Sequence, residues 1–249
     1  MRKPLMAGNW KMYKTAAETT AFFEKFAPLV AQSVHADAVI CPTFVNIPAA
    51  VAATQGTRIE IGGQNLYWKN EGAFTGEISG PMLKAAGARW VIVGHSERRQ
   101  YFGETDATVL QRTVAALEAG LNPIVCVGER LEQRESGNTE SVLKTQFDGG
   151  LAGLTPDQFA KVTIAYEPVW AIGTGKTATP EMAADAHKFI RAQVAAKFGA
   201  EQAAATRILY GGSVKPDNVK SLMAQPDIDG SLVGGASLEA VSFSLIVNF

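Results

Sequence analysis

Two side chains suited to acid–base chemistry follow strand-like segments of the sequence. Glu167 ends the apolar run VTIAYE and precedes Pro168. Because a residue before proline is restricted to an extended conformation, Glu167 is expected at the tip of a strand. A carboxylate held there between apolar side chains is a candidate general base. A structural ion pair would explain this glutamate equally well.

His95 follows the apolar run WVIVG and opens the segment SERRQYF, which can form a helix. A histidine at a helix N-terminus feels the positive end of the helix dipole, which disfavours the imidazolium form. A neutral ring in this place could donate a hydrogen bond to a substrate carbonyl. The alternative, taken from His95 alone, is a structural histidine with satisfied hydrogen bonds.

Glycine-rich turns follow the last two strand-like runs of the chain. They are Gly211 and Gly212, followed by Ser213, and the pair Gly234 and Gly235. Glycines in such loops let backbone N–H groups approach a ligand, and barrels often bind phosphate after strands seven and eight. Ordinary turn chemistry would account for either pair alone, but both together favour a phosphate site.

The stretch AIGTGKTA, residues 171–178, resembles a nucleotide-binding loop without satisfying its spacing. A P-loop needs glycine five residues before Gly175, and that position is Trp170. The glycine spacing of a dinucleotide-binding motif is present. However, Pro168 ends the preceding strand early, and the next helix does not begin until Pro180. We therefore expect a long loop whose glycines serve another ligand.

Asn9 and Lys11 follow the first strand-like run, and Lys11 would point inward if that run is a barrel strand; a solvated lysine is the alternative.

Glu129 follows the fifth run, so Glu129 and Glu167 could also be imagined as the carboxylate pair of a glycosidase. The phosphate-type loops argue against a neutral sugar as the substrate.

Composition excludes several classes of function. The 249 residues carry a net charge of −1 with no basic face or acidic tail, so nucleic-acid binding is not expected. No apolar run reaches the roughly 20 residues of a membrane span, and we predict a cytoplasmic protein without a membrane partner. Cys41 and Cys126 are expected to be buried thiols, and the three histidines lack a metal-ligand spacing, so no metal site is predicted.

Eight short apolar runs alternate with helical patterns along the whole chain. A helix is expected over Pro180–Phe198, capped by Thr179, stopped by Gly199, and buried along Met182, Ala186, Phe189, Ile190 and Val194. The predicted strands are Leu5–Gly8, Ala38–Cys41, Ile59–Gly62, Trp90–Val93, Pro123–Val127, Val162–Tyr166, Arg207–Tyr210 and Gly230–Val233. Apolar strands alternating with helices predict a parallel sheet covered by helices.

The positions of the polar and glycine residues that follow the predicted strands favour a single (β/α)8 barrel domain over residues 1–249. An open doubly wound sheet is the alternative. In a barrel, the loops that leave the carboxyl ends of the strands meet at one mouth. The long connection Gln64–Ser79 carries Tyr67, Trp68 and Phe74, and we interpret it as a subunit-contact arm. A loop folded back on its own barrel is the alternative.

Nearly the whole chain resembles the triosephosphate isomerase family. The resemblance lies in AGNWKM (7–12), GAFTGEIS (72–79), VIVGHSERR (91–99), AYEPVWAIGTGKTA (165–178), YGGSV (210–214) and VGGASL (233–238), all in family order. Two departures are small: Tyr13 stands where the family often has asparagine, and IVNF extends slightly past the usual C-terminus.

By resemblance, Glu167 is the base and His95 the electrophile, Asn9 and Lys11 contact the substrate, and its phosphate is bound by Gly173, Ser213, Gly234 and Gly235. The resemblance also implies a cofactor-free homodimer of glycolysis and gluconeogenesis. AIGTGKTA would then be a lid, which keeps water from an enediolate that can expel phosphate. A non-catalytic phosphosugar-binding barrel and a glycosidase are the competing hypotheses.

Overall fold

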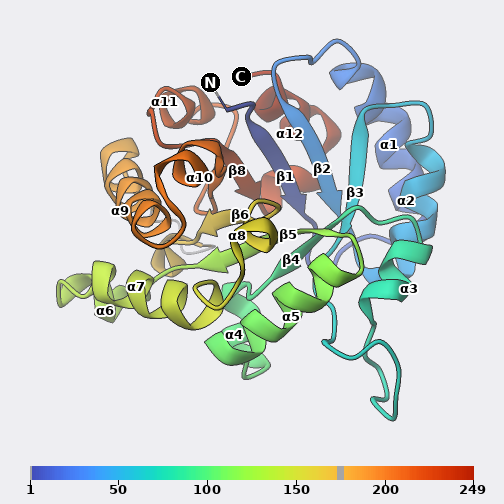
Figure 1. The fold of residues 1–249 in the computed structure, drawn as a ribbon. Coiled ribbons are helices and arrows are strands. Elements are labelled where there is room, and N and C mark those ends of the chain that lie inside the picture. The colour runs from blue at the N-terminus through green and yellow to red at the C-terminus, as the bar shows by residue number, and fades with distance from the viewer. Residues whose placement is uncertain (1, 173–176) are drawn as a thin grey trace.

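The computed structural model describes residues 2–172 and 177–249, and within them eight parallel strands close into a barrel (Figure 1). The strands are β1 (Leu5–Asn9), β2 (Asp37–Cys41), β3 (Ile59–Gly63), β4 (Trp90–Val93), β5 (Asn122–Val127), β6 (Thr163–Tyr166), β7 (Ile208–Tyr210) and β8 (Gly230–Val233). Each predicted strand is present with its ends displaced by at most one residue. The predicted barrel is confirmed, because β1 pairs with β8 as well as with β2, which excludes the open sheet.

Helices surround the barrel in Figure 1. They are α1 (Ala16–Val30), α2 (Ile47–Ala53), α3 (Gly80–Ala85), α4 (Ser96–Tyr101), α5 (Asp106–Glu118), α6 (Leu131–Glu135), α7 (Thr139–Gly150), α8 (Pro156–Phe159), α9 (Pro180–Phe198), α10 (Ala200–Ala205), α11 (Val219–Met223) and α12 (Ala240–Val247). Short 3₁₀ turns cover Phe44–Asn46, Val169–Ala171 and Gly235–Leu238.

Several helices begin at the capping residues that the sequence supplies. Thr15 and Glu18 form a reciprocal capping box at the start of α1. The predicted helix at Pro180–Phe198 is confirmed as α9, capped by the side chain of Thr179 and ended by Gly199, whose φ of +92° favours glycine.

The buried face of α9 differs from the predicted one. Ala186, Ile190 and Val194 are buried as expected, whereas Met182 and Phe189 are only partly buried. Ala183 and His187 are buried instead.

The barrel has two apolar layers because successive side chains of a strand point to opposite faces. Leu5 and Ala7 of β1 belong to one cluster, together with Val39, Cys41, Trp90, Ile92, Ile124, Cys126, Ala165, Leu209 and Leu232, which fills the interior. Met6 belongs to the larger cluster between the strands and the helices. Both cysteines are free and buried, as predicted. Strands buried on both faces leave only their carboxyl ends and the following loops available for chemistry.

Three further predictions concern the chain as a whole. Within the described ranges, no helix is both long and apolar enough to cross a bilayer. In the same ranges, no group of three or more His, Cys, Asp or Glu side chains is placed to hold a metal ion. The single-domain organisation over residues 1–249 stays a prediction.

Candidate active site

The residues singled out in the sequence meet at the carboxyl-terminal mouth of the barrel. Asn9 ends β1, His95 follows β4 and Glu167 follows β6. With Lys11 they line a cavity of about 270 Å³, which we call the front cavity. The remaining walls come from the loops after β6, β7 and β8, namely residues 171–172, 211–215 and 232, 234–236.

His95 and Glu167 are in direct contact although 72 positions separate them in the sequence. The Nε2 atom of His95 lies 2.8 Å from Oε1 of Glu167, and the backbone N–H of Ser96 donates to Oε2 at 2.8 Å. Only 6% of His95 and 2% of Glu167 is exposed. Both oxygens of the carboxylate are therefore held by groups at the start of α4.

The position of His95 at the N-terminus of α4 sets its tautomer. Its Nδ1 atom accepts a hydrogen bond from the backbone N–H of Glu97 at 3.2 Å, so Nδ1 carries a lone pair and the ring proton lies on Nε2. An imidazolium would present a second N–H to that backbone donor. The geometry thus places a ring proton on Nε2, directed at Glu167, and the neutral form of the ring stays a prediction.

The contact changes the pKa of both groups. Burial lowers the pKa of His95, but the charge and hydrogen bond of Glu167 outweigh it, and the pKa lies above its ordinary value. Burial raises the pKa of Glu167, but the charge and hydrogen bond of His95 and the N–H of Ser96 outweigh it, and the pKa lies below its ordinary value. Both shifts depend on the contact, so separating the two side chains would remove their main cause.

Lys11 is held in place by an uncommon backbone conformation. Its φ is +50°, in the left-handed region that side-chain-bearing residues rarely adopt. The Oδ1 atom of Asn9 accepts its N–H at 3.0 Å, and Nε2 of Gln64 donates to its carbonyl at 2.8 Å. The ammonium group lies 2.5 Å from Oε1 of Glu97, and the side chain passes over Gly234. Lys11 therefore brings a positive charge between His95 and the loop after β8.

The glycine-rich turns allow close packing around Glu167. A Cβ at Gly211 would lie 2.9 Å from Cγ of Glu167, and one at Gly212 would collide with the hydroxyl of Tyr210. Ser213, Gly234 and Gly235 line the front cavity, as their predicted phosphate contact requires. Gly173, the fourth residue predicted to bind phosphate, lies outside the described residues.

Glu129 has a different environment from Glu167. It is fully buried, and its Oε1 accepts hydrogen bonds from the hydroxyl of Tyr166 at 3.0 Å and Nε1 of Trp170 at 3.0 Å, with Arg134 at 3.2 Å. It does not line the front cavity. The structure therefore gives no support to a glycosidase pair of Glu129 and Glu167, and it makes Glu129 an anchor for the turn that follows β6.

Three contributions to the site were missed by reasoning on the sequence. They are the N–H of Ser96 on Glu167, the carboxylate of Glu97 on Lys11, and the amide of Gln64 on the backbone of Lys11. The start of a helix directly after His95 could have indicated the first, because the leading N–H groups of a helix lack partners within it. The contacts of Glu97 and Gln64 with Lys11 connect loops that follow different strands, so no local sequence pattern indicates them.

The arm Gln64–Ser79 extends from the barrel between β3 and α3 (Figure 1). The ring of Tyr67 stacks on Trp68 at 4.0 Å and meets Phe74 at 4.5 Å between centroids. The guanidinium of Arg112, on α5, lies 4.8 Å from the ring of Trp68. Residues 69–77 are exposed. The base of the arm is thus braced against the barrel, while its tip is open to contact.

The fold and the site together define a (β/α)8-barrel enzyme with a buried histidine–carboxylate pair at its carboxyl-terminal mouth. A family profile described as triosephosphate isomerase matches residues 4–249. Triosephosphate isomerases of Solibacter usitatus and Citrifermentans bemidjiense are 70% and 57% identical over 249 residues, which is all of this chain and at least 99% of each relative.

A crystal structure of triosephosphate isomerase from Bartonella henselae superposes with a TM-score of 0.89 at 41% identity, covering 98% of this chain and 97% of that one. The chain belongs to the triosephosphate isomerase family, and its class of activity is therefore that of an isomerase.

Proposed function

We propose that the protein interconverts dihydroxyacetone phosphate and D-glyceraldehyde 3-phosphate through an enediol(ate), as a step of glycolysis and gluconeogenesis. The observation that carries this proposal is the contact between Nε2 of His95 and Oε1 of Glu167 inside a cavity that also holds Lys11. An aldose–ketose isomerisation needs a base for a carbon proton, a donor for the carbonyl oxygen and a positive charge near the oxyanion. These three groups supply them.

Glu167 takes the proton from the carbon beside the carbonyl and later returns it to the neighbouring carbon. For this the carboxylate leaves Nε2 of His95, and the substrate oxygen takes its place as the hydrogen-bond acceptor. Loss of that contact raises the pKa of Glu167 from its lowered resting value, because burial then acts with less opposition. A carboxylate whose pKa rises toward the working pH is a better base for a carbon acid.

His95 donates its Nε2 proton to the carbonyl oxygen and recovers a proton from the adjacent hydroxyl, so the ring ends each turnover as it began. The N–H of Glu97 on Nδ1 keeps the acidic proton on the correct nitrogen. Lys11 lies beside both the reacting oxygens and the loop that holds Gly234, and it offsets the charge of the oxyanion and of the phosphate. Because the reaction moves only protons, these side chains need no cofactor.

Substrate phosphate is proposed to bind the backbone of Ser213, Gly234 and Gly235, which line the front cavity. Asn9 supports the position of Lys11 through its hydrogen bond. By resemblance, residues 168–170 are one hinge of the lid, and within them Nε1 of Trp170 donates to Oε1 of Glu129 at 3.0 Å. Closure of such a lid would keep water from the enediolate.

A homodimer built on the arm Gln64–Ser79 is also proposed, in the cytoplasm. Asn9, Lys11, His95 and Glu97 border a second, open cavity of about 440 Å³, which Met12, Tyr13 and Phe102 also line. Met12 is 91% exposed and Phe102 66% exposed. Large apolar side chains around an open hollow suit burial by a second copy. The exposed tip of the arm, with the apolar side chain of Phe74, is the segment that we propose to enter it.

Isomerisation of glyceraldehyde 3-phosphate in D₂O, followed by proton NMR, tests this function. The wild type is expected to form dihydroxyacetone phosphate with solvent deuterium on carbon, and Glu167→Ala is expected to form almost none. Turnover by Glu167→Ala at the wild-type rate would remove Glu167 from the role of base. Binding of the sugar phosphate without turnover by the wild type would instead indicate a non-catalytic binding barrel.

A further inference from the structure

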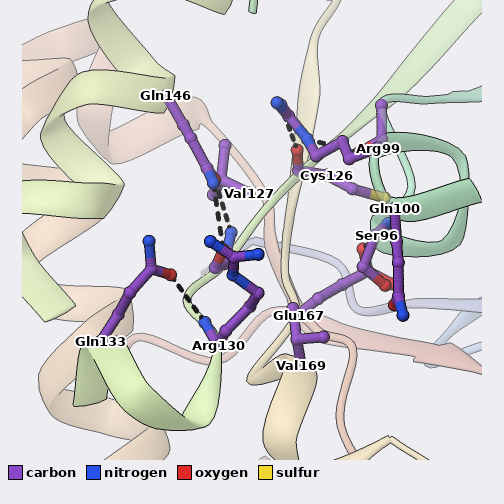
Figure 2. Close-up of a pocket in the computed structure, with 12 residues that line it drawn as sticks. Ser96, Arg99, Gln100, Cys126, Val127, Arg130, Gln133, Gln146, Glu167 and Val169 are labelled. Atoms are coloured by element: carbon purple, nitrogen blue, oxygen red, sulfur yellow. Dashed lines mark hydrogen bonds between the residues drawn. The ribbon is translucent and has the colours of Figure 1, made fainter. Parts of the chain in front are cut away.

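Glu167 separates two cavities. The front cavity lies on its substrate side, and a rear cavity of about 230 Å³ lies behind it, lined among others by Ser96, Cys126 and Gln146 (Figure 2). Glu167 lines both cavities, so hydrogen bonds contribute to its position in addition to packing. Its position therefore depends on its hydrogen bonds and on the placement of its backbone.

The backbone of Glu167 is placed by the last residue of β5 and the segment that follows it. Its N–H donates to the carbonyl of Val127 at 2.8 Å, and the N–H of Val169 donates to the carbonyl of Glu129 at 3.0 Å. Between these two bonds, a Cβ at Gly128 would collide with the carbonyl oxygen of Glu167. The backbones of Gly128 and Glu167 therefore pack directly against each other, and a shift of one is passed to the other.

Gly128 is held by one side chain, that of Gln146 on α7. Its N–H donates to Oε1 of Gln146 at 2.7 Å, and Nε2 of Gln146 donates to its carbonyl at 3.0 Å (Figure 2). A carboxamide can accept and donate at once, which neither a carboxylate nor an apolar side chain can do. The neighbours Leu143 and Phe147 are buried and fix α7 against the barrel.

We propose that Gln146 is a positioning residue for the catalytic carboxylate, acting through Gly128 on the backbone of Glu167. The inference rests on the proposed role of Glu167 as base. Gln146 does not line the front cavity, so it is not expected to contact substrate. Since misplacement of a reacting group by about 1 Å can cost on the order of 10²-fold in rate, a loosened Gly128 would slow proton abstraction more than it weakens binding.

Gln146→Met and Gln146→Glu test this proposal. Methionine has a similar length but makes neither bond, and kcat is expected to fall about 10- to 100-fold. The KM for glyceraldehyde 3-phosphate, and the inhibition constant of glycerol 3-phosphate, are expected to change by no more than about two-fold. Glutamate at neutral pH keeps an acceptor for the N–H of Gly128 but sets a charge against its carbonyl. As the pH falls and that carboxyl gains a proton, the kcat of Gln146→Glu relative to wild type should rise.

Gln133→Met is the matched control. Gln133 lines the same rear cavity, and its side-chain oxygen accepts from the N–H of Arg130 at 2.8 Å instead of holding Gly128. The control is expected to keep the wild-type kcat. If Gln146→Met also keeps it, or loses phosphate affinity instead of kcat, the inference is overturned. If Gln146→Met does not fold, the test rests on Gln146→Glu. A kcat of Gln146→Glu that stays in constant ratio to the wild-type kcat across pH overturns the inference. A wild type without turnover would instead overturn the proposed function itself.

Discussion

The imidazole of His95 and the carboxylate of Glu167 meet at 2.8 Å, so each takes the hydrogen-bonding position that the proposed substrate would use on the other. In the proposed mechanism, this contact keeps the base, Glu167, buried directly beside the proton donor, His95. Substrate entry must exchange this internal bond for bonds to the carbonyl oxygen and the carbon proton. The catalytic consequences of changing either residue follow from that exchange.

Glu167→Asp withdraws the carboxylate by one carbon–carbon bond while keeping its charge. Turnover should fall on the order of 10²-fold, because a displacement near 1 Å misplaces the base relative to the carbon proton. Steady-state kinetics give the loss, and thermal unfolding checks that the fold is retained. Near-normal turnover in a folded variant would contradict the assignment of Glu167 as base.

His95→Ala should raise the pKa of Glu167. Burial raises this pKa, and His95 is the largest cause that lowers it, so removal of the ring leaves burial opposed mainly by the N–H of Ser96. Titration of the Glu167 carboxyl carbon by NMR, in wild type and variant, measures the shift without requiring activity. A pKa that stays where it was, or moves down, would show that His95 does not control the charge of the carboxylate.

Lys11→Met should lower kcat/KM about 10²- to 10³-fold, because a positive charge directed at the developing oxyanion is lost. Lys14→Met is the control: the ammonium of Lys14 lies over the rings of Trp10 and Phe22, and it does not line the front cavity. The control should remain close to wild type. Equal losses in the two variants would point to a general effect of charge rather than to a role of Lys11 in the site.

Phe74→Asp should weaken self-association and lower activity together. Phe74 is 39% exposed on the arm, and a charge there opposes burial against a second copy. Sedimentation velocity at several protein concentrations measures the oligomeric state. Val241→Asp places the same charge on an exposed apolar position of α12 and should leave association unchanged. A Phe74 variant that associates like wild type would remove the arm from the proposed interface.

His187 makes stability depend on pH on the acid side. Burial lowers its pKa from an ordinary value of 6.5 to about 4. Between these values the unfolded chain binds a proton that the folded chain does not, so the free energy of unfolding decreases as the pH falls. His187→Gln should remove up to about 3 kcal/mol of this decrease, measured by urea unfolding across that range. His35→Gln, at an exposed histidine, is the control, and parallel curves for wild type and His187→Gln would contradict the prediction.

Much of the fold could be read from the sequence because its signals are local. Each barrel strand is a short apolar run closed by turn residues, and α9 is marked by Thr179, Pro180 and Gly199. A glycine at a left-handed position and a proline in the first turn of a helix each restrict the backbone only within a few residues. The residues after each strand could therefore be assigned to one mouth as soon as a parallel barrel was expected.

The contacts within the site were decided only by the tertiary structure. Closure of β8 on β1 brings the loop of Gly234 to Lys11, and the barrel brings His95 to Glu167 across the sequence. Glu129, which resembled a second catalytic carboxylate, is turned instead toward Tyr166 and Trp170. Sequence determines which side chains reach the mouth, because strand and turn preferences are local. Which of them touch depends on strand register and on packing across the barrel, which no short segment encodes.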